Sequence, residues 1–120
     1  DALRMGASTA AEDETDLSKV HFDLECFEAF AKGYLSEMKD VLTPKEIELI
    51  PMSVWLLTYE CGTRFLTDYL DGDVYFKIHR ENHNLERARN QFALCREMAD
   101  KEEEMRAIVS NLIKNNYFKI

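Results

Sequence analysis

The fold class of this chain is decided by residues 54–76, VWLLTYECGTRFLTDYLDGDVYF. Apolar side chains recur there at steps of three and four, the spacing of one face of an α-helix, at Val54, Leu57, Cys61, Phe65 and Tyr69. Further apolar residues widen that face: Trp55, Leu56, Tyr59, Leu66 and Leu70. A helix that is apolar on most sides is expected to be buried on most sides. The segment therefore predicts the central helix of an all-α domain.

The end of this central helix is predicted by the turn sequence Asp71-Gly72-Asp73, because glycine readily adopts the left-handed conformation that caps a helix. Arg64 lies beside the apolar stripe. An arginine in that position either extends along the helix edge with its charge in water or points into a pocket. The residues by themselves favour the edge and leave the pocket open.

The flanking segments predict about four helices in all. Apolar residues at helical spacing indicate one helix over residues 22–40 and a long last helix over residues 85–115. Thr43-Pro44-Lys45-Glu46 combines an N-cap hydroxyl, a proline in the first turn and a glutamate at the third position, so a short helix is expected from Pro44 to about Leu49. Residues 1–20 are expected to form a loosely ordered acidic arm, and residues 21–120 the helical domain.

Composition excludes several functional classes. The chain has 120 residues, 15 basic and 23 acidic, for a net charge of −8. This charge argues against binding to nucleic acid or to an anionic membrane surface. No apolar run approaches a membrane span and no signal peptide is visible, so a cytoplasmic protein is expected. Its three widely spaced cysteines, Cys26, Cys61 and Cys95, are expected to be reduced core residues.

No complete catalytic constellation can be assembled from these residues. His79 and His83 have the i, i+4 spacing of metal ligands on a helix, but the neighbouring Asn82 and Asn84 argue against a helix there. Neither a catalytic residue nor a metal ligand is therefore predicted. Physical interpretation alone ends at a helical domain without visible catalytic machinery.

Three stretches nevertheless resemble a known family. They are DALRMGA (residues 1–7), AAEDE (residues 10–14) and ECGTRFLTDYLDGDVYFKIHRENHNLERARNQF (residues 60–92). Together they resemble the carboxy-terminal part of the aminoglycoside-phosphotransferase-like kinases, the group that includes N-acetylhexosamine 1-kinases. Some relatives in that group carry the label mucin-desulfating sulfatase, for which this sequence offers no chemical reason.

The resemblance implies a two-lobed kinase that binds ATP and Mg²⁺ between its lobes. In that family an H-x-D motif and a second acidic motif supply the catalytic aspartate and the metal ligands, and both would precede Asp1. The resemblance thus implies that this chain is a helical piece of the large lobe, inactive by itself, whose partner is the rest of that lobe. It also implies that Arg64 and Tyr75 face the acceptor, an amino sugar.

Two functional hypotheses follow. The first is this carboxy-terminal fragment of a sugar phosphotransferase, expected to form a homodimer when isolated because its contact surface for the rest of the lobe is uncovered. The second is a self-contained helical protein-interaction module without catalysis. The coding sequence upstream of Asp1 discriminates them, because only the first predicts an H-x-D-x-x-x-x-N motif there.

Overall fold

The computed structural model describes residues 1–115, and within them the chain is all-α without strands, as predicted. The described part has six α-helices rather than about four, and four of them have seven residues or more. The elements are α1 (Ala2–Gly6), the 3-10 helix η1 (Leu17–Lys19), α2 (Leu24–Met38), α3 (Pro44–Glu48), α4 (Ile50–Asp71), α5 (His83–Asp100) and α6 (Glu102–Asn115).

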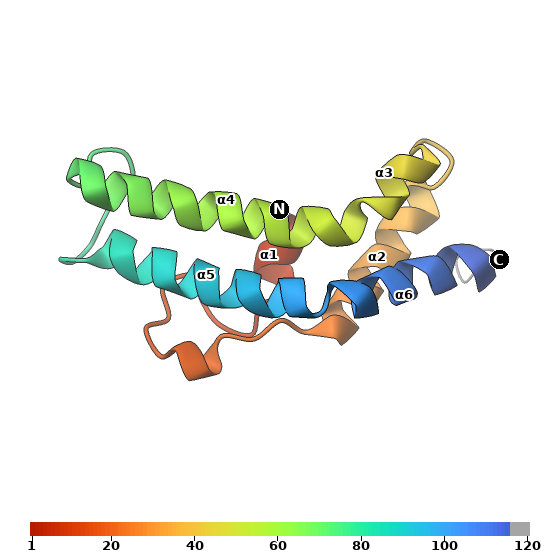
Figure 1. The fold of residues 1–120 in the computed structure, drawn as a ribbon, viewed down its shortest axis with the longest axis horizontal. Helices are drawn as coiled ribbons and strands as arrows, with labels where there is room; N and C mark the ends of the chain where they lie inside the picture. Colours follow the sequence, from red (N-terminus) through yellow and green to blue (C-terminus); the bar gives the residue numbers. More distant parts are fainter. Residues whose placement is uncertain (116–120) are drawn as a thin grey trace.

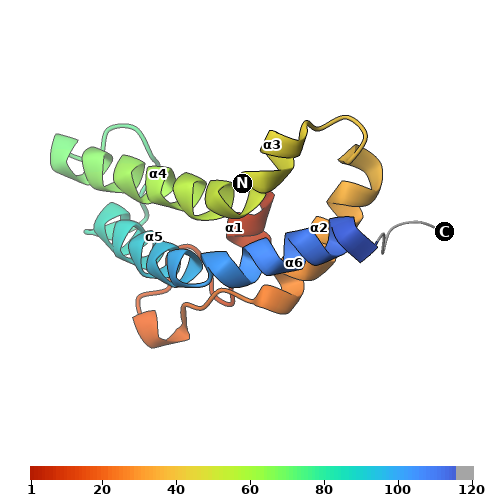
Figure 2. The same ribbon diagram turned by 45° about the vertical axis from the view of Figure 1, so that its right-hand side comes forward.

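The molecule is elongated, with principal extents of 51 × 27 × 21 Å. Helices α4 and α5 lie side by side and antiparallel through one half of it, and α6 continues the direction of α5 into the other half (Figure 1). Helix α2 crosses α6 there, and α1 lies near the middle, beneath the start of α4; the turned view shows the same arrangement (Figure 2).

The core lies where α2 and α6 cross and where α5 meets the first half of α4. Its largest fully buried apolar side chains are Phe27, Leu35, Leu94, Met98, Met105 and Leu112. The far ends of α4 and α5 extend beyond this core and pack against each other. Residues 11–14 also contact this part of α5, at His83 and Asn90, so the outer face that is left to solvent belongs to α4.

The prediction that the central helix is buried on most sides is wrong. Helix α4 buries one face: Pro51, Val54, Thr58, Gly62, Phe65 and Asp68. Leu56, Tyr59 and Leu70 are 44%, 54% and 73% exposed. The reason is that α5 alone covers most of the length of α4, and no described element covers the opposite face.

Local end signals of the helices are confirmed. Thr43 and Glu46 form a capping box, in which the Glu46 N–H donates to Thr43 Oγ1 (3.2 Å) and the Thr43 N–H donates to Glu46 Oε2 (2.7 Å). Gly72 ends α4 in the left-handed conformation, with φ of 96°. Both signals act within a few residues along the chain, which is why the sequence could reveal them.

The expected last helix over residues 85–115 is two helices that meet at Lys101. Lys101 leaves helical geometry (φ −100°, ψ 10°), and its Nζ donates to Phe22 O (3.1 Å) and Glu97 Oε1 (2.9 Å). The three glutamates 102–104 then occupy the first turn of α6, where carboxylates are favourable for the helix dipole. The acidic residues 102–104 therefore begin a new helix.

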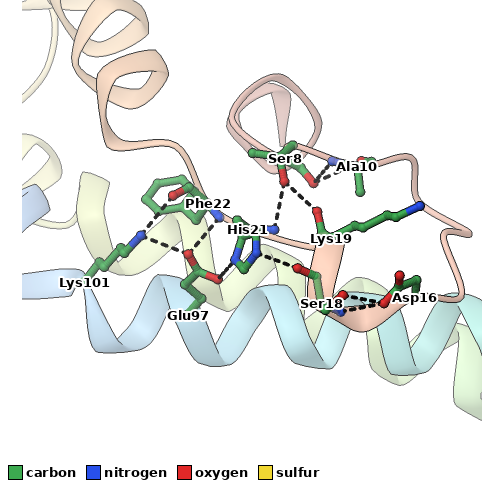
Figure 3. A network of polar contacts seen from close by, with 10 residues as sticks. Ser8, Ala10, Asp16, Ser18, Lys19, His21, Phe22, Glu97 and Lys101 are labelled. Atoms are coloured by element: carbon green, nitrogen blue, oxygen red, sulfur yellow. Dashed lines mark hydrogen bonds and ion pairs between the residues drawn. The ribbon is translucent and has the colours of Figure 1, made fainter.

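Residues 1–20, expected as a loosely ordered arm, contain α1 and η1 and bury Leu3, Ala7 and Val20. Figure 3 shows how the return of this segment toward α2 is held against α5. Glu97 Oε1 accepts the Phe22 N–H at 3.2 Å, and Glu97 Oε2 lies 3.1 Å from His21 Nδ1. One carboxylate on α5 thus binds two consecutive residues that precede α2.

We expect the His21 contact to weaken as pH rises. The hydrogen bond to Glu97 raises the pKa of His21 above its ordinary 6.5, helped by the Ser18 carbonyl. A raised folded-state pKa contributes stability below 6.5, and this contribution is lost as pH rises through the folded-state value. An NMR titration of the imidazole should show a lower pKa in Glu97→Gln and no change in the control Glu104→Gln. An identical His21 titration in both variants would contradict the assignment.

Two mid-helix glycines should respond oppositely to alanine. A Cβ on Gly33 meets nothing within 4 Å, so Gly33→Ala should stabilise the chain by about 0.5–1 kcal/mol. A Cβ on Gly62 would lie 2.8 Å from Phe92 Cε1 and 3.3 Å from Gln91 Cβ, so Gly62→Ala should destabilise it by about 1–2 kcal/mol. Urea unfolding of the two variants measures both changes. Equal gains would show that α4 and α5 do not approach closely at Gly62.

Candidate functional site

Arg64 and Tyr75, eleven positions apart, lie together at the free end of the α4–α5 pair. Arg64 Nη2 donates to Tyr75 Oη at 3.4 Å, and the guanidinium carbon lies 5.6 Å from the Tyr75 ring centroid and 5.4 Å from that of Phe76. The two residues belong to the wall of a groove of about 460 Å³, lined by Arg64, Thr67, Asp68, Asp71, Val74, Tyr75 and Phe76. Arg64 therefore borders a concave surface.

Asp68 organises this groove, and sequence reasoning missed its role. The residue is 4% exposed. Its Oδ1 accepts the N–H groups of Val74 (3.0 Å) and Tyr75 (2.8 Å), and its Oδ2 accepts the Phe76 N–H (3.0 Å). The loop after Gly72 thus wraps around one carboxylate, and that carboxylate sets the position of Tyr75.

The charge of Asp68 is stabilised by the same contacts. Burial acts to raise the pKa of Asp68, but the N–H groups of Phe76, Tyr75 and Val74, together with the Asn84 amide, hold it below the ordinary 3.8. The sequence carried one signal for this role. Asp68 falls three residues after Phe65, on the helix face that turns out to be buried.

Asn84 connects the groove to α5. It is fully buried, and its Nδ2 donates to Asp68 Oδ2 (2.7 Å) and to Asp73 Oδ1 (2.9 Å). Its Oδ1 accepts from Arg87 Nη1 (3.1 Å), which also donates to the Lys77 carbonyl (3.1 Å). The loop between α4 and α5 is therefore held from both helices. The asparagine that argued against a helix lies in the first turn of α5.

A second pocket, of about 250 Å³, adjoins the groove and shares Arg64 and Phe76 with it. Its full lining is Arg4, Glu12, Cys61, Arg64, Phe65, Phe76, Lys77 and Arg87. The Phe65 and Phe76 rings lie 4.8 Å apart by their centroids, and the Arg87 guanidinium carbon lies 5.5 Å from the Phe65 ring. This pocket combines aromatic walls with cationic side chains from α1, α4, α5 and the intervening loop.

The cysteines differ from one another in burial. Cys95 is buried and Cys61 is half-buried, but Cys26 is exposed, so its prediction as a core residue is wrong. Burial raises the pKa of both Cys61 and Cys95, which favours the protonated thiol at neutral pH. Helix α2 presents Cys26 on its solvent side because its buried face is formed by Phe27, Ala31 and Leu35.

His79 and His83 do not act as a ligand pair in this arrangement. The His83 ring is 2% exposed, its Nδ1 accepts the His79 N–H (3.2 Å), and its Nε2 lies 2.9 Å from Asp13 Oδ2. Both His83 nitrogens are therefore used within the protein. Among residues 1–115, no group of three or more His, Cys, Asp or Glu side chains is placed to hold a metal ion.

The groove can bind a polar ligand through a guanidinium, a phenol and an aromatic ring that converge at its wall. No protein-family model matches the sequence of this chain. No helix in the described part of the chain has the length and apolar character needed to cross a membrane.

Proposed function

We propose that this chain is the carboxy-terminal helical part of an ATP-dependent N-acetylhexosamine phosphotransferase, where it forms one wall of the acceptor-sugar site. The observation that carries the proposal is the groove in which Arg64 lies 3.4 Å from the Tyr75 hydroxyl. ATP and Mg²⁺ would be bound by parts of the enzyme outside this chain. No residue of the chain is assigned a catalytic or metal-binding role.

The chemistry of the groove suits a sugar. Tyr75 is 72% exposed, so it offers a ring face for the C–H side of a pyranose and a hydroxyl for hydrogen bonding. Arg64 offers a planar fork of donors that can bind neighbouring hydroxyls. A groove of about 460 Å³ is within the roughly 300–1,000 Å³ typical of small-molecule sites.

The requirements of phosphoryl transfer indicate which steps this chain would serve and which the rest of the kinase would serve. That reaction depends on positioning the acceptor and on neutralising charge at the phosphates. Arg64 and Tyr75 would supply positioning only, and the catalytic aspartate, the asparagine and the metal ligands would come from the remainder of the kinase. The isolated chain should therefore bind acceptor weakly and phosphorylate nothing.

We expect Arg64→Ala and Tyr75→Ala to abolish binding of N-acetylglucosamine or N-acetylgalactosamine to the chain, measured by NMR titration. In the longer kinase, either variant should lower kcat/KM about 10–100-fold, the effect of losing a charge-assisted hydrogen bond or a ring contact. Arg89→Ala is the matched control for the arginine, because Arg89 lies outside the groove. A longer protein inactive on a panel of hexosamines would contradict the proposal.

A second function is favoured by the apolar surface. One exposed apolar surface is the open face of α4. Another is on α2, where the Phe30 and Tyr34 rings stack with their centroids 6.2 Å apart and are 42% and 41% exposed. In the kinase proposal the rest of the lobe covers such surface; in an interaction module a partner protein does. As an isolated fragment of the kinase, the chain should form a two-fold homodimer, because its contact surface for the rest of the lobe is uncovered. Light scattering that shows a monomer at high concentration would oppose this expectation, and the upstream coding sequence separates the two functions.

A further inference from the structure

We propose that the second pocket, of about 250 Å³, is an oxyanion site that binds the phosphate group of a phosphate monoester. The inference does not rest on the sugar proposal, because three of its four basic side chains lie outside the sugar groove. Those are Arg4 of α1, Lys77 of the loop and Arg87 of α5.

The charge of the pocket opposes the charge of the protein. The chain carries 15 basic and 23 acidic residues, yet four basic side chains and a single carboxylate, Glu12, line this pocket. Glu12 forms an ion pair with Arg4, in which Glu12 Oε2 lies 2.6 Å from Arg4 Nη1. The pocket thus holds a net positive charge in an acidic protein, which selects anions.

The remaining cations are not neutralised. Among residues 1–115, Arg64, Lys77 and Arg87 form no ion pair with a carboxylate. Arg64 contacts the neutral Tyr75 hydroxyl, and Arg87 donates to the Lys77 carbonyl and the Asn84 amide oxygen. Neutral acceptors fix the guanidinium groups in place without cancelling their charge.

The guanidinium groups are also oriented before any ligand arrives. That of Arg87 lies over the Phe65 ring and that of Arg64 over the Phe76 ring, at 5.5 and 5.4 Å, and the two rings contact each other. Two planar forks and one ammonium around an aromatic wall match the oxygens of a phosphate dianion. Since the rings exclude water on one side, the attraction is stronger than at an open surface.

The test is a titration of the whole chain with inorganic phosphate and with methyl phosphate, followed by calorimetry and ³¹P NMR. Arg64→Gln and Lys77→Gln replace exposed side chains, and each should weaken the binding of both phosphates about tenfold or more. Arg89→Gln and Lys45→Gln make the same charge change outside the pocket and should shift affinity less than twofold. Equal weakening in all four variants would overturn the proposal, because it would indicate attraction to overall charge.

Cys61 provides an independent readout, because it lines the pocket and is half-buried. In a Cys26→Ser background, phosphate should slow its alkylation by the neutral reagent N-ethylmaleimide, whereas potassium chloride of equal ionic strength should not. Binding of inorganic phosphate with exclusion of methyl phosphate would overturn the monoester assignment. Lys77→Gln should weaken phosphate binding and leave sugar binding within twofold, because Lys77 lines this pocket and not the sugar groove, so failure of the sugar proposal is distinguishable from failure of this one.

Discussion

Replacing Asp68 by alanine should disorder the loop that carries Tyr75 and lower the melting temperature by on the order of 10 °C. The substitution removes the acceptor of three backbone N–H groups and of the Asn84 amide, and the residue is buried. Donors left without a partner in a buried place are costly. Thermal unfolding by circular dichroism measures the loss, and amide NMR signals of residues 74–76 report the loop.

The matched control is Asp71→Ala, because Asp71 lines the same groove and is exposed. It should change the melting temperature by no more than about 2 °C. A similar fall in melting temperature in Asp68→Ala and Asp71→Ala would mean that the carboxylates act through general charge rather than through the loop contacts. An unchanged loop in Asp68→Ala would contradict the role assigned to this residue.

The same carboxylate should contribute to acid unfolding. Because its folded-state pKa lies below the ordinary 3.8, Asp68 stabilises the fold above that value, and the contribution is lost as pH falls through the folded-state pKa. Asp68→Asn should therefore reduce the slope of stability against pH below about pH 4. The slope should remain in the Asp71→Asn control.

Leu94→Ala should destabilise the chain by about 3 kcal/mol, within the 2–5 kcal/mol that buried leucines typically lose. Leu94 is fully buried on α5, in the cluster that joins α1, α2, α4 and α6. Leu56→Ala makes the same chemical change on α4, at a side chain that is 44% exposed, and should cost about 0.5 kcal/mol or less. Urea unfolding measures both.

This pair tests where the fold is centred. If α4 were buried on most sides, Leu94→Ala and Leu56→Ala would lower the free energy of unfolding by similar amounts. A large loss in Leu56→Ala would show that the open face of α4 is covered in solution, as it would be in a dimer. The variant should therefore be measured over a range of protein concentrations.

The candidate site shows how far residue patterns reach. Arg64 and Tyr75 were identified through the resemblance in residues 60–92, and the structure places them in contact. The sequence patterns predict no role in the site for Asp68. Nothing in its neighbours along the chain shows that a loop eight residues further on returns to its carboxylate.

What the sequence by itself determined is local: the all-α class, the capping box at Thr43 and the left-handed end of α4 at Gly72. Those features depend on dihedral preferences and hydrogen bonds between near neighbours. The tertiary structure alone decided which face of α4 is buried, that the last helix divides at Lys101, and that Asp68 holds the loop. Each of these depends on a partner distant in the chain, and burial is a property of the pair of surfaces that meet.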